Sequence, residues 1–416
     1  MTQTLAGVTV VDLTQVVSGA VTTMLMAEFG AEVIKVEPPQ GEPYRNAGFP
    51  ISNDQGETNL NILRFSRGKK SITLDLKTEG GRRILSDLIA KADVLIENFR
   101  PDVLPRLGFG RDEIESLNPR IVYATISGFG HDDLFESPYR DRPAYAIVTE
   151  AMAGLTHLAG NGRGTPVWMG FAMADIYAGT LALSGIALAL KERAETGLGR
   201  RVDISMYDAS VFMNDLALAT YSALGTVIGP GNYTLQSPWG PFVTADGHVV
   251  VAVLAEHQWV ALCDVIGRPE LLADERLSAG WGRSKHHDDV VEPAISSWTS
   301  MRTKAECTEV LLARGIPSAP VNTAADIAAC PQVAAREMLV DVQDDVAGTV
   351  RLVGNPIKLD GEDGLAERRI PRLGEHTNHV LSSLLDLDEE QIASLAAEGA
   401  FGKRSDAAAE QAGART

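Results

Sequence analysis

The sequence predicts an α/β protein in which a parallel sheet carries helices on its faces, together with a second, smaller domain. Two β-α-β patterns near the N-terminus support the sheet, because each joins a β-rich apolar run, a helix and a second strand. The length of 416 residues supports the second domain, since one hydrophobic core rarely serves so long a chain. A stretch rich in Gly and Pro after residue 225 marks the boundary.

The elements of the first domain follow from the spacing of apolar residues. The two β-α-β units are predicted at 8–13, 19–29 and 32–36, and at 71–76, 79–91 and 94–97. Further strands are predicted at 121–127 and 201–205, with helices at 143–158, 171–190 and 206–224. Residues 38–59 are predicted to form a long loop. Because the turn after the first strand lacks the G-x-G-x-x-G pattern, a nicotinamide or flavin cofactor is not predicted.

The remaining chain is predicted to contain a linker and small domain at 225–331, with a strand at 249–254. Short β-like segments return at 344–359, and a helix is predicted at 378–385. Residues 401–416 offer little apolar surface to bury, so we expect a disordered tail.

The composition is that of a soluble globular protein, with 45% hydrophobic and 22% charged residues. A net charge of -18 argues against nucleic acid or an anionic membrane as the main partner. The N-terminus lacks the pattern of a signal peptide, and the uncharged run after Asp175 spans 15 residues, which is short for a membrane span. Because three widely spaced cysteines suit a reducing compartment, we expect a cytoplasmic protein.

No metal site is predicted. His286, His287, Asp288 and Asp289 are consecutive, so their side chains point in different directions and a charged surface turn is favoured. His376 and His379 have helical spacing, but no third ligand is identifiable nearby.

Asp175 is the only charged residue between Phe171 and Leu190. A carboxylate in such an apolar run needs either a strong local partner or a chemical role. One interpretation is that Asp175 caps a buried helix, because Asp is favoured at the N-cap. The other interpretation is that Asp175 is a catalytic residue. The run by itself favours the cap.

A locally basic segment lies between residues 61 and 110, with ten basic side chains against six acidic ones. An anion such as a phosphate could bind there. A solvated helix face is the favoured explanation for Arg82, Arg83 and Lys91, whereas the loop sequence R-F-S-R-G-K-K is less easily assigned to such a face.

Several stretches resemble the class III CoA-transferases, a family that also contains the α-methylacyl-CoA racemases. They occur in the family's order and spacing over about the first 220 residues, which makes the set specific. The stretches are L-A-G-V-T-V-V-D-L-T, G-A-E-V-I-K-V-E-P-P, S-R-G-K-K-S-I-T-L-D-L-K, V-L-I-E-N-F-R-P-D-V-L-P-R-L-G, I-V-Y-A-T-I-S-G-F-G, R-P-A-Y-A-I-V-T-E-A-M-A-G-L, A-D-I-Y-A-G and G-R-R-V-D-I-S-M-Y-D-A. A weaker similarity occurs at R-L-G-E-H-T near the C-terminus.

The resemblance implies that Asp175 is a nucleophile that forms a mixed anhydride with an acyl group and then an aspartyl-CoA thioester. Such chemistry needs a carboxylate in a site that excludes water, and the start of an apolar helix offers both charge stabilisation and dryness. It also implies a set of residues along CoA: Val16, Lys69, Lys70, Leu74, Asn98, Phe99, Arg106 and Tyr145. Phe99 could stack on adenine, and Arg106 or the lysine pair could bind a phosphate.

The fold implied by the resemblance is an interlaced homodimer. Each chain has a large Rossmann-like, CoA-binding domain formed by residues 1–224 and again by 332–400, and a small α+β domain. Acyl-CoA and a carboxylic acid are the implied substrates, with no tightly bound cofactor.

Tyr145 stands where the racemases carry a catalytic histidine, which favours the transferases, because tyrosine is a poor proton shuttle at neutral pH. Val17 stands where relatives often carry a glutamine. An acyl-CoA racemase or epimerase remains the alternative, and a CoA-binding protein without activity is a third. The sequence leaves the donor and acceptor acids open, as well as whether Glu256 or His257 reaches the acceptor.

Overall fold

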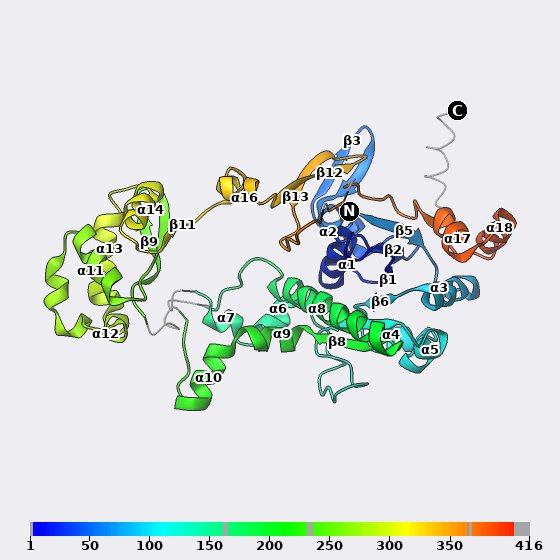
Figure 1. The fold of residues 1–416 in the computed structure, drawn as a ribbon, viewed down its shortest axis with the longest axis horizontal. Coiled ribbons are helices and arrows are strands. Elements are labelled where there is room, and N and C mark those ends of the chain that lie inside the picture. The colour runs from blue at the N-terminus through cyan, green and yellow to red at the C-terminus, as the bar shows by residue number, and fades with distance from the viewer. Residues whose placement is uncertain (1–2, 161–164, 231–235, 363, 366–367, 403–416) are drawn as a thin grey trace. The chain divides into compact units, whose positions relative to one another are not determined.

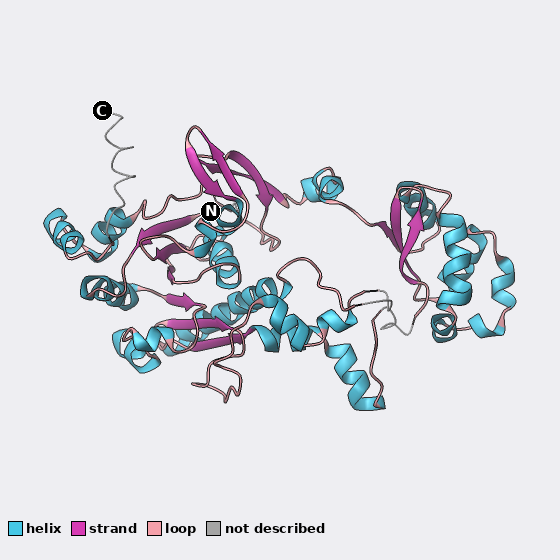
Figure 2. Ribbon diagram, turned by 180° about the vertical axis from the view of Figure 1, so that it is seen from behind, coloured by secondary structure: helices cyan, strands magenta, loops and turns pink. Residues whose placement is uncertain are grey.

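A computed structural model describes residues 3–160, 165–230, 236–362, 364–365 and 368–402. The chain divides into two compact units (Figures 1 and 2). The large unit comprises Met1–Thr156, Trp168–Asp215 and Glu337–Thr416, and the small unit comprises His157–Val167 and Leu216–Arg336. The predicted disordered tail at 401–416 lies outside the described residues from 403 onward.

A six-stranded parallel sheet organises the large unit. Its order is β5-β2-β1-β6-β7-β8, with every neighbouring pair parallel. The strands are β1 (Thr9–Asp12), β2 (Glu32–Glu37), β5 (Lys69–Thr73), β6 (Val94–Glu97), β7 (Val122–Ser127) and β8 (Arg201–Ser205). In chain order this is the 3-2-1-4-5-6 arrangement of doubly wound nucleotide-binding sheets. The strand order therefore reverses between β1 and β6, where such sheets bind ligands.

Two apolar cores cover the two faces of this sheet, because successive strand residues point to opposite faces. Val10 belongs to one core and Val11 to the other. The core with Val11 includes residues of α3 (Glu79–Lys91), α5 (Arg111–Leu117), α17 (Thr377–Leu385) and α18 (Glu389–Ala397). The core with Val10 includes residues of α1 (Ser18–Glu28), α6 (Ala146–Met152), α8 (Met173–Thr196) and α9 (Met206–Met213). Helices from both ends of the chain thus pack on one sheet.

Helix α8 packs closely on α1. A Cβ atom at Gly179 would lie 2.3 Å from the Ser18 carbonyl oxygen, so only glycine permits this approach. Thr22 Oγ1 donates a hydrogen bond to the Gly179 carbonyl oxygen at 2.8 Å. This contact holds the first turns of the two helices together.

The sequence predicts a buried helix at α8, but the structure buries only one stripe of small residues, which includes Ala174, Ala178 and Ala182. Leu188, on another face, is 72% exposed. Among the described residues, α8 is the one helix with the length and composition to cross a membrane, a test that the core helix of a soluble protein also passes. Its contacts with α1, β7 and β8 place it in the large unit as a packing helix.

Three predicted elements differ from the structure. The predicted loop at 38–59 contains a 3-10 turn, η1 (Pro43–Arg45), and a hairpin of β3 (Pro50–Asn53) and β4 (Gly56–Asn59). The helix predicted at 143–158 breaks at Gly154, whose φ of 81° is left-handed. The helix predicted at 206–224 breaks at Asn214, whose side chain donates a hydrogen bond to the Ala153 carbonyl oxygen at 2.7 Å.

The other elements complete both units. In the large unit these are α2 (Leu60–Phe65), α4 (Val103–Arg106) and the hairpin of β12 (Leu339–Asp344) and β13 (Gly348–Val353). The small unit has an antiparallel sheet of β11 (Ser318–Pro320), β10 (Gly247–Ala252) and β9 (Trp239–Thr244). Its main helices are α11 (Glu256–Val265), α12 (Gly280–Lys285), α13 (Glu292–Thr299) and α14 (Lys304–Ala313). The remaining helical segments are α7 (Leu155–Leu158), α10 (Asp215–Leu224), η2 (Pro269–Ala273), η3 (Glu275–Leu277), η4 (His287–Val291), α15 (Ala324–Ala328) and α16 (Pro331–Ala335).

Candidate active site

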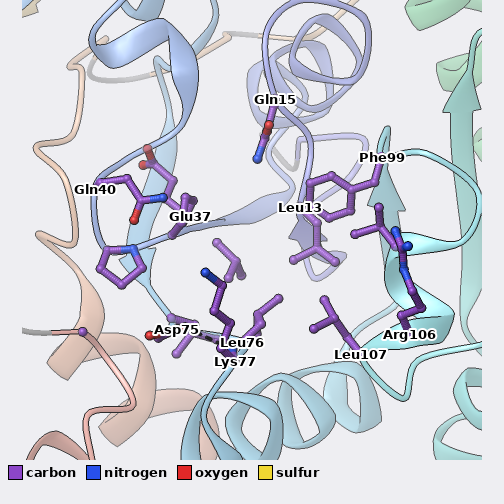
Figure 3. Close-up of a pocket in the computed structure, with 16 residues that line it drawn as sticks. Leu13, Gln15, Glu37, Gln40, Asp75, Leu76, Lys77, Phe99, Arg106 and Leu107 are labelled. Carbon is purple, nitrogen blue, oxygen red and sulfur yellow. Dashed lines mark hydrogen bonds between the residues drawn. The ribbon is translucent and has the colours of Figure 1, made fainter. Parts of the chain in front are cut away.

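A cavity of about 510 Å³ lies at the carboxyl ends of the sheet strands, where the strand order reverses (Figure 3). The loops after β1, β2, β5 and β6 form its walls. Its lining residues are Leu13, Gln15, Val36, Glu37, Pro38, Pro39, Gln40, Leu74, Asp75, Leu76, Lys77, Phe99, Val103, Arg106, Leu107 and Gly402. The cavity combines apolar walls with two cations, Lys77 and Arg106, and two acids, of which Glu37 is paired with Arg45. The apolar walls and the cations suit a ligand that has both an aromatic ring and anionic groups.

Three of the residues predicted to lie along CoA line this cavity: Leu74, Phe99 and Arg106. Figure 3 shows Phe99 beside Leu13 and the side chains of Lys77 and Arg106 around the same space. Arg106 is exposed and pairs with Asp102 at 3.0 Å, an interaction that solvent weakens. Its guanidinium is therefore accessible to an incoming anion.

Asn98 does not line the cavity but hydrogen-bonds to Gln15, which does. Its Oδ1 accepts a hydrogen bond from the Gln15 backbone N–H, and its Nδ2 donates one to the Gln15 carbonyl oxygen, both at 2.8 Å. The side chain also donates to Ser18 Oγ at 3.1 Å. Asn98 thus fixes the β1–α1 turn.

Val16, in the same turn, has a left-handed φ of 67°. A β-branched residue is strained in that region, and such strain is often found at functional sites. The Val16 backbone N–H donates to Glu42 Oε2 at 3.1 Å, and Glu42 also pairs with the buried Lys35 at 3.6 Å. These contacts hold the strained residue between the cavity and α1.

The structure corrects the expectation for the lysine pair. Lys69 is buried and pairs with Asp12 at 3.1 Å, while Thr23 Oγ1 lies 2.7 Å from its Nζ. Burial lowers the pKa of Lys69 to about 8 although Asp12 opposes the shift. Lys70 pairs with Glu32 at 2.5 Å. Neither lysine lines the cavity, because both side chains are held by these acids. Lys77, which was not predicted from the sequence to bind CoA, lies there instead.

Asp175 is the third residue of α8, and it does not cap the helix. The N-cap is Ala172, which provides no side-chain hydrogen bond. Glu150 of α6 takes that role, because its Oε1 accepts a hydrogen bond from the Ala174 backbone N–H at 3.0 Å. The Asp175 side chain has no hydrogen bond or ion pair with any described residue. Burial, and then the neighbouring Glu150, raise the pKa of Asp175 to about 7.

Apolar side chains surround the start of α8 on the side of α1. Val16 and Ile176, the neighbour of Asp175, pack against a cluster that includes Val17 and Val21. Tyr44 packs there too, and its pKa is raised by burial and by the charges of Asp175 and Glu42. Tyr44 is thus a second residue that the sequence analysis missed. Tyr145 is the N-cap of α6, the helix that carries Glu150, and is 74% exposed.

The small-domain candidate Glu256 is held by Arg283, whose guanidinium donates two hydrogen bonds of 2.8 Å to its carboxylate. These bonds lower the pKa of Glu256. No group of three or more His, Cys, Asp or Glu side chains among the described residues could hold a metal ion.

The fold and site together define a doubly wound α/β protein with a nucleotide-sized cavity and a half-buried carboxyl, Asp175, that lies at a helix start and pairs with no described residue. The chain matches the family model for CoA-transferase family III over residues 5–377, and it belongs to that family. It is a class III CoA-transferase.

Relatives and a solved structure agree with this assignment. The chain is 37% identical to an acetyl-CoA:oxalate CoA-transferase of Acetobacter aceti, over 89% of this chain and 92% of that protein. It is 35% identical to the beta subunit of a succinyl-CoA–L-malate CoA-transferase of Chloroflexus aurantiacus, over 93% and 96%. A crystal structure of a CAIB/BAIF family protein from Brucella suis has a TM-score of 0.82 and 30% identity, over 92% of this chain and all of that one. The matches span nearly the whole chain.

Proposed function

We propose that this enzyme moves CoA from an acyl-CoA to a carboxylic acid through covalent intermediates on Asp175. An Asp175 oxygen attacks the thioester carbonyl and the C–S bond breaks. CoA departs as the thiolate, and the acyl group stays on Asp175 as a mixed anhydride. The thiolate then attacks Asp175 Cγ and releases the donor acid, which leaves an aspartyl-CoA thioester. The acceptor carboxylate displaces the thiolate from Cγ, and the thiolate attacks the acceptor's acyl carbon to free Asp175.

The observation that carries this proposal is the isolation of the Asp175 carboxyl. A nucleophilic carboxylate must be free of strong partners, and no described residue bonds to it. With a pKa of about 7, Asp175 is substantially ionised at neutral pH, yet it is more basic than an ordinary aspartate. The apolar contacts of the adjacent Ile176 limit access of water, which would hydrolyse an anhydride.

We place CoA in the cavity at the end of the sheet. Phe99 provides a ring for stacking, and Arg106 and Lys77 provide positive charge for phosphate groups. Asn98 and Val16 shape the turn that lies between this cavity and α1, on which α8 packs. The pantetheine arm would follow this turn toward Asp175.

We propose a homodimer on the basis of exposed apolar side chains in the large unit. Phe212 is 68% exposed and Leu188 is 72% exposed, and Ile147 and Met152 of α6 are exposed as well. Apolar surface of this extent is typical of a face that a partner covers. A cytoplasmic location remains a proposal that rests on the free cysteines Cys263, Cys307 and Cys330.

The acceptor we propose is a short dicarboxylic acid. The proposal rests on the relatives, whose names include oxalate and L-malate as acceptors. The test is a matrix of acetyl-, formyl- and succinyl-CoA against oxalate, malate, mesaconate and acetate, with product CoA esters measured by mass spectrometry. Transfer in any pair, lost in Asp175→Ala, supports the proposal. If the protein instead exchanges the α-hydrogen of a 2-methylacyl-CoA in deuterated water and transfers nothing, it is a racemase.

A further inference from the structure

We infer that Glu150 is a positioning residue for Asp175. Glu150 holds the first turn of α8 in place, and its own carboxylate lies near the nucleophile. This inference rests on the proposed function of Asp175 and assigns a role to a neighbour on another helix.

The Glu150 carboxylate is buried and is held in place by two hydrogen bonds. The residue is 1% exposed, and both of its oxygens accept N–H hydrogen bonds. One bond comes from the Ala174 backbone at 3.0 Å, and the other comes from Trp168 Nε1 at 2.9 Å. Because both oxygens act as acceptors, the pattern is that of an ionised carboxylate. The N-terminus of α8 stabilises this charge.

The consequence for Asp175 is electrostatic. Two neighbouring carboxylates resist being ionised together, so the charge of Glu150 makes the Asp175 carboxylate more basic. Formation of the mixed anhydride or the aspartyl thioester removes the Asp175 charge and ends the repulsion. Glu150 therefore favours the covalent intermediates over the free carboxylate.

Other ionisable groups lie on elements that pack against α8. They are Tyr44 on η1, Glu28 on α1, Tyr123 on β7, Arg201 and Asp203 on β8, and Tyr207 and Asp208 on α9. Of these, Tyr44 has an electrostatic interaction with Asp175, and it is a neutral phenol at the pH of the reaction. Within the part of the chain that the structure describes, Glu150 is the charged group that raises the pKa of Asp175, after the effect of burial.

The first test is the titration of the Asp175 carboxyl by ¹³C NMR on aspartate-labelled protein, with Asp175→Asn to assign the signal. We expect Glu150→Gln to lower the midpoint by about one pH unit, because the amide keeps the Ala174 contact but removes the charge. The control is Glu192→Gln, which removes an equal charge from the exposed end of α8, where Glu192 pairs with Arg200. It should leave the midpoint in place.

An amide at position 150 cannot accept from both N–H donors, which could impair folding. The double variant Glu150→Gln with Trp168→Phe removes the donor that the amide leaves unpaired and should titrate as the single variant does. An Asp175 midpoint that stays unchanged in these variants, or that moves equally in Glu192→Gln, would overturn the inference.

The second test is the amount of aspartyl-CoA thioester at equilibrium with a fixed acyl-CoA concentration. We expect the equilibrium amount of aspartyl-CoA thioester in Glu150→Gln to be roughly tenfold lower than in the parent enzyme, because a shift of one pH unit in the Asp175 midpoint corresponds to a tenfold change in an equilibrium constant. An equal amount would contradict the role in stabilising intermediates. Because the titration needs no turnover, a shifted midpoint in a protein that never forms an Asp175 adduct would reject the proposed function and leave the electrostatic coupling intact.

Discussion

Two aspartates of the large unit, the buried Asp12 and the half-buried Asp175, differ in the direction of their pKa shifts. Asp12 ends β1 and has four partners: Lys69 Nζ at 3.1 Å, the backbone N–H and hydroxyl of Thr14 at 2.9 and 2.6 Å, and the Thr23 hydroxyl at 2.7 Å. Burial opposes its charge, but the lysines and hydrogen bonds lower its pKa below the ordinary value. Asp175 has no such partner, and its pKa rises to about 7.

The difference shows that burial alone does not make a carboxylate reactive. The desolvation cost is common to both residues, and the partners decide its outcome. A carboxylate that is fully hydrogen-bonded serves as a structural anion beneath the sheet end. A half-buried carboxylate with no partner among the described residues and with a second acid nearby is more basic, and it is available to attack an electrophile.

The largest expected effect is the loss of turnover in Asp175→Asn. Removing a covalent nucleophile should lower kcat by roughly 10⁴-fold or more. The fold should survive, because the variant removes a partly desolvated charge and no hydrogen bond to a described residue. Steady-state transfer assays and circular dichroism check both points, and retained turnover would place the nucleophile elsewhere.

Asp12→Asn should instead reduce the stability of the fold. It leaves Lys69 buried without its counter-ion, which typically costs about 3–5 kcal/mol of unfolding free energy. Urea denaturation measures this loss. Equal stability of Asp12→Asn and the parent protein would show that the buried pair contributes nothing.

The two aspartates should also give opposite pH dependences of stability. The folded-state pKa of Asp175 is raised, so its contribution is fully present below about pH 4 and is lost as the pH rises through about 7. The folded-state pKa of Asp12 is lowered, so its contribution is present above about pH 4 and is lost as the pH falls through the folded pKa. Asp175→Asn should therefore gain stability over the parent between pH 4 and 7, on the order of 2 kcal/mol after allowance for solvent screening. Urea midpoints at a series of pH values test the sign.

In activity, the same raised pKa predicts an acid limb near pH 7. Only the ionised Asp175 attacks the thioester, so kcat/KM should fall tenfold per pH unit below that point. An acid limb near pH 4 would mean that Asp175 has an ordinary pKa in the free enzyme.

A smaller effect is expected in the cavity. Arg106→Ala should raise the KM for acyl-CoA about tenfold with little change in kcat, because a phosphate contact acts equally in ground and transition states. Lys70→Ala is the matched control, since Lys70 pairs with Glu32 and does not line the cavity. An equal rise in both variants would indicate a general loss of positive charge.

Much of this fold is predictable from local pattern. The strand Val94–Glu97 and the helix Glu79–Lys91 occur with the predicted bounds, because their apolar periodicity agrees with their burial. The β3–β4 hairpin is not predictable in this way, since its strands are largely polar and β3 is mostly exposed. It also depends on a distant contact, because the Asn53 side chain donates a hydrogen bond to the Val346 carbonyl oxygen.

The site residues differ in the same way, because some are predictable from the sequence and others depend on contacts that only the fold creates. The resemblance selected Asp175, Phe99 and Arg106, whereas Glu150 lies in a stretch that is indistinguishable from an ordinary helix. Its burial depends on Ala174 and Trp168, which only the fold brings to it. The opposite error at Lys69 has the same origin, because sequence shows a charge but not the acid that neutralises it.

The most direct test of covalent catalysis by Asp175 is to capture the acyl or CoA group on the protein. Incubation with acetyl- or succinyl-CoA, followed by borohydride or hydroxylamine and peptide mass spectrometry, reports which side chain was modified. We expect modification of Asp175 in the parent enzyme, and none in Asp175→Asn. An enzyme that transfers CoA at full rate with Asp175 unmodified, or that carries the adduct on another residue, would contradict this expectation.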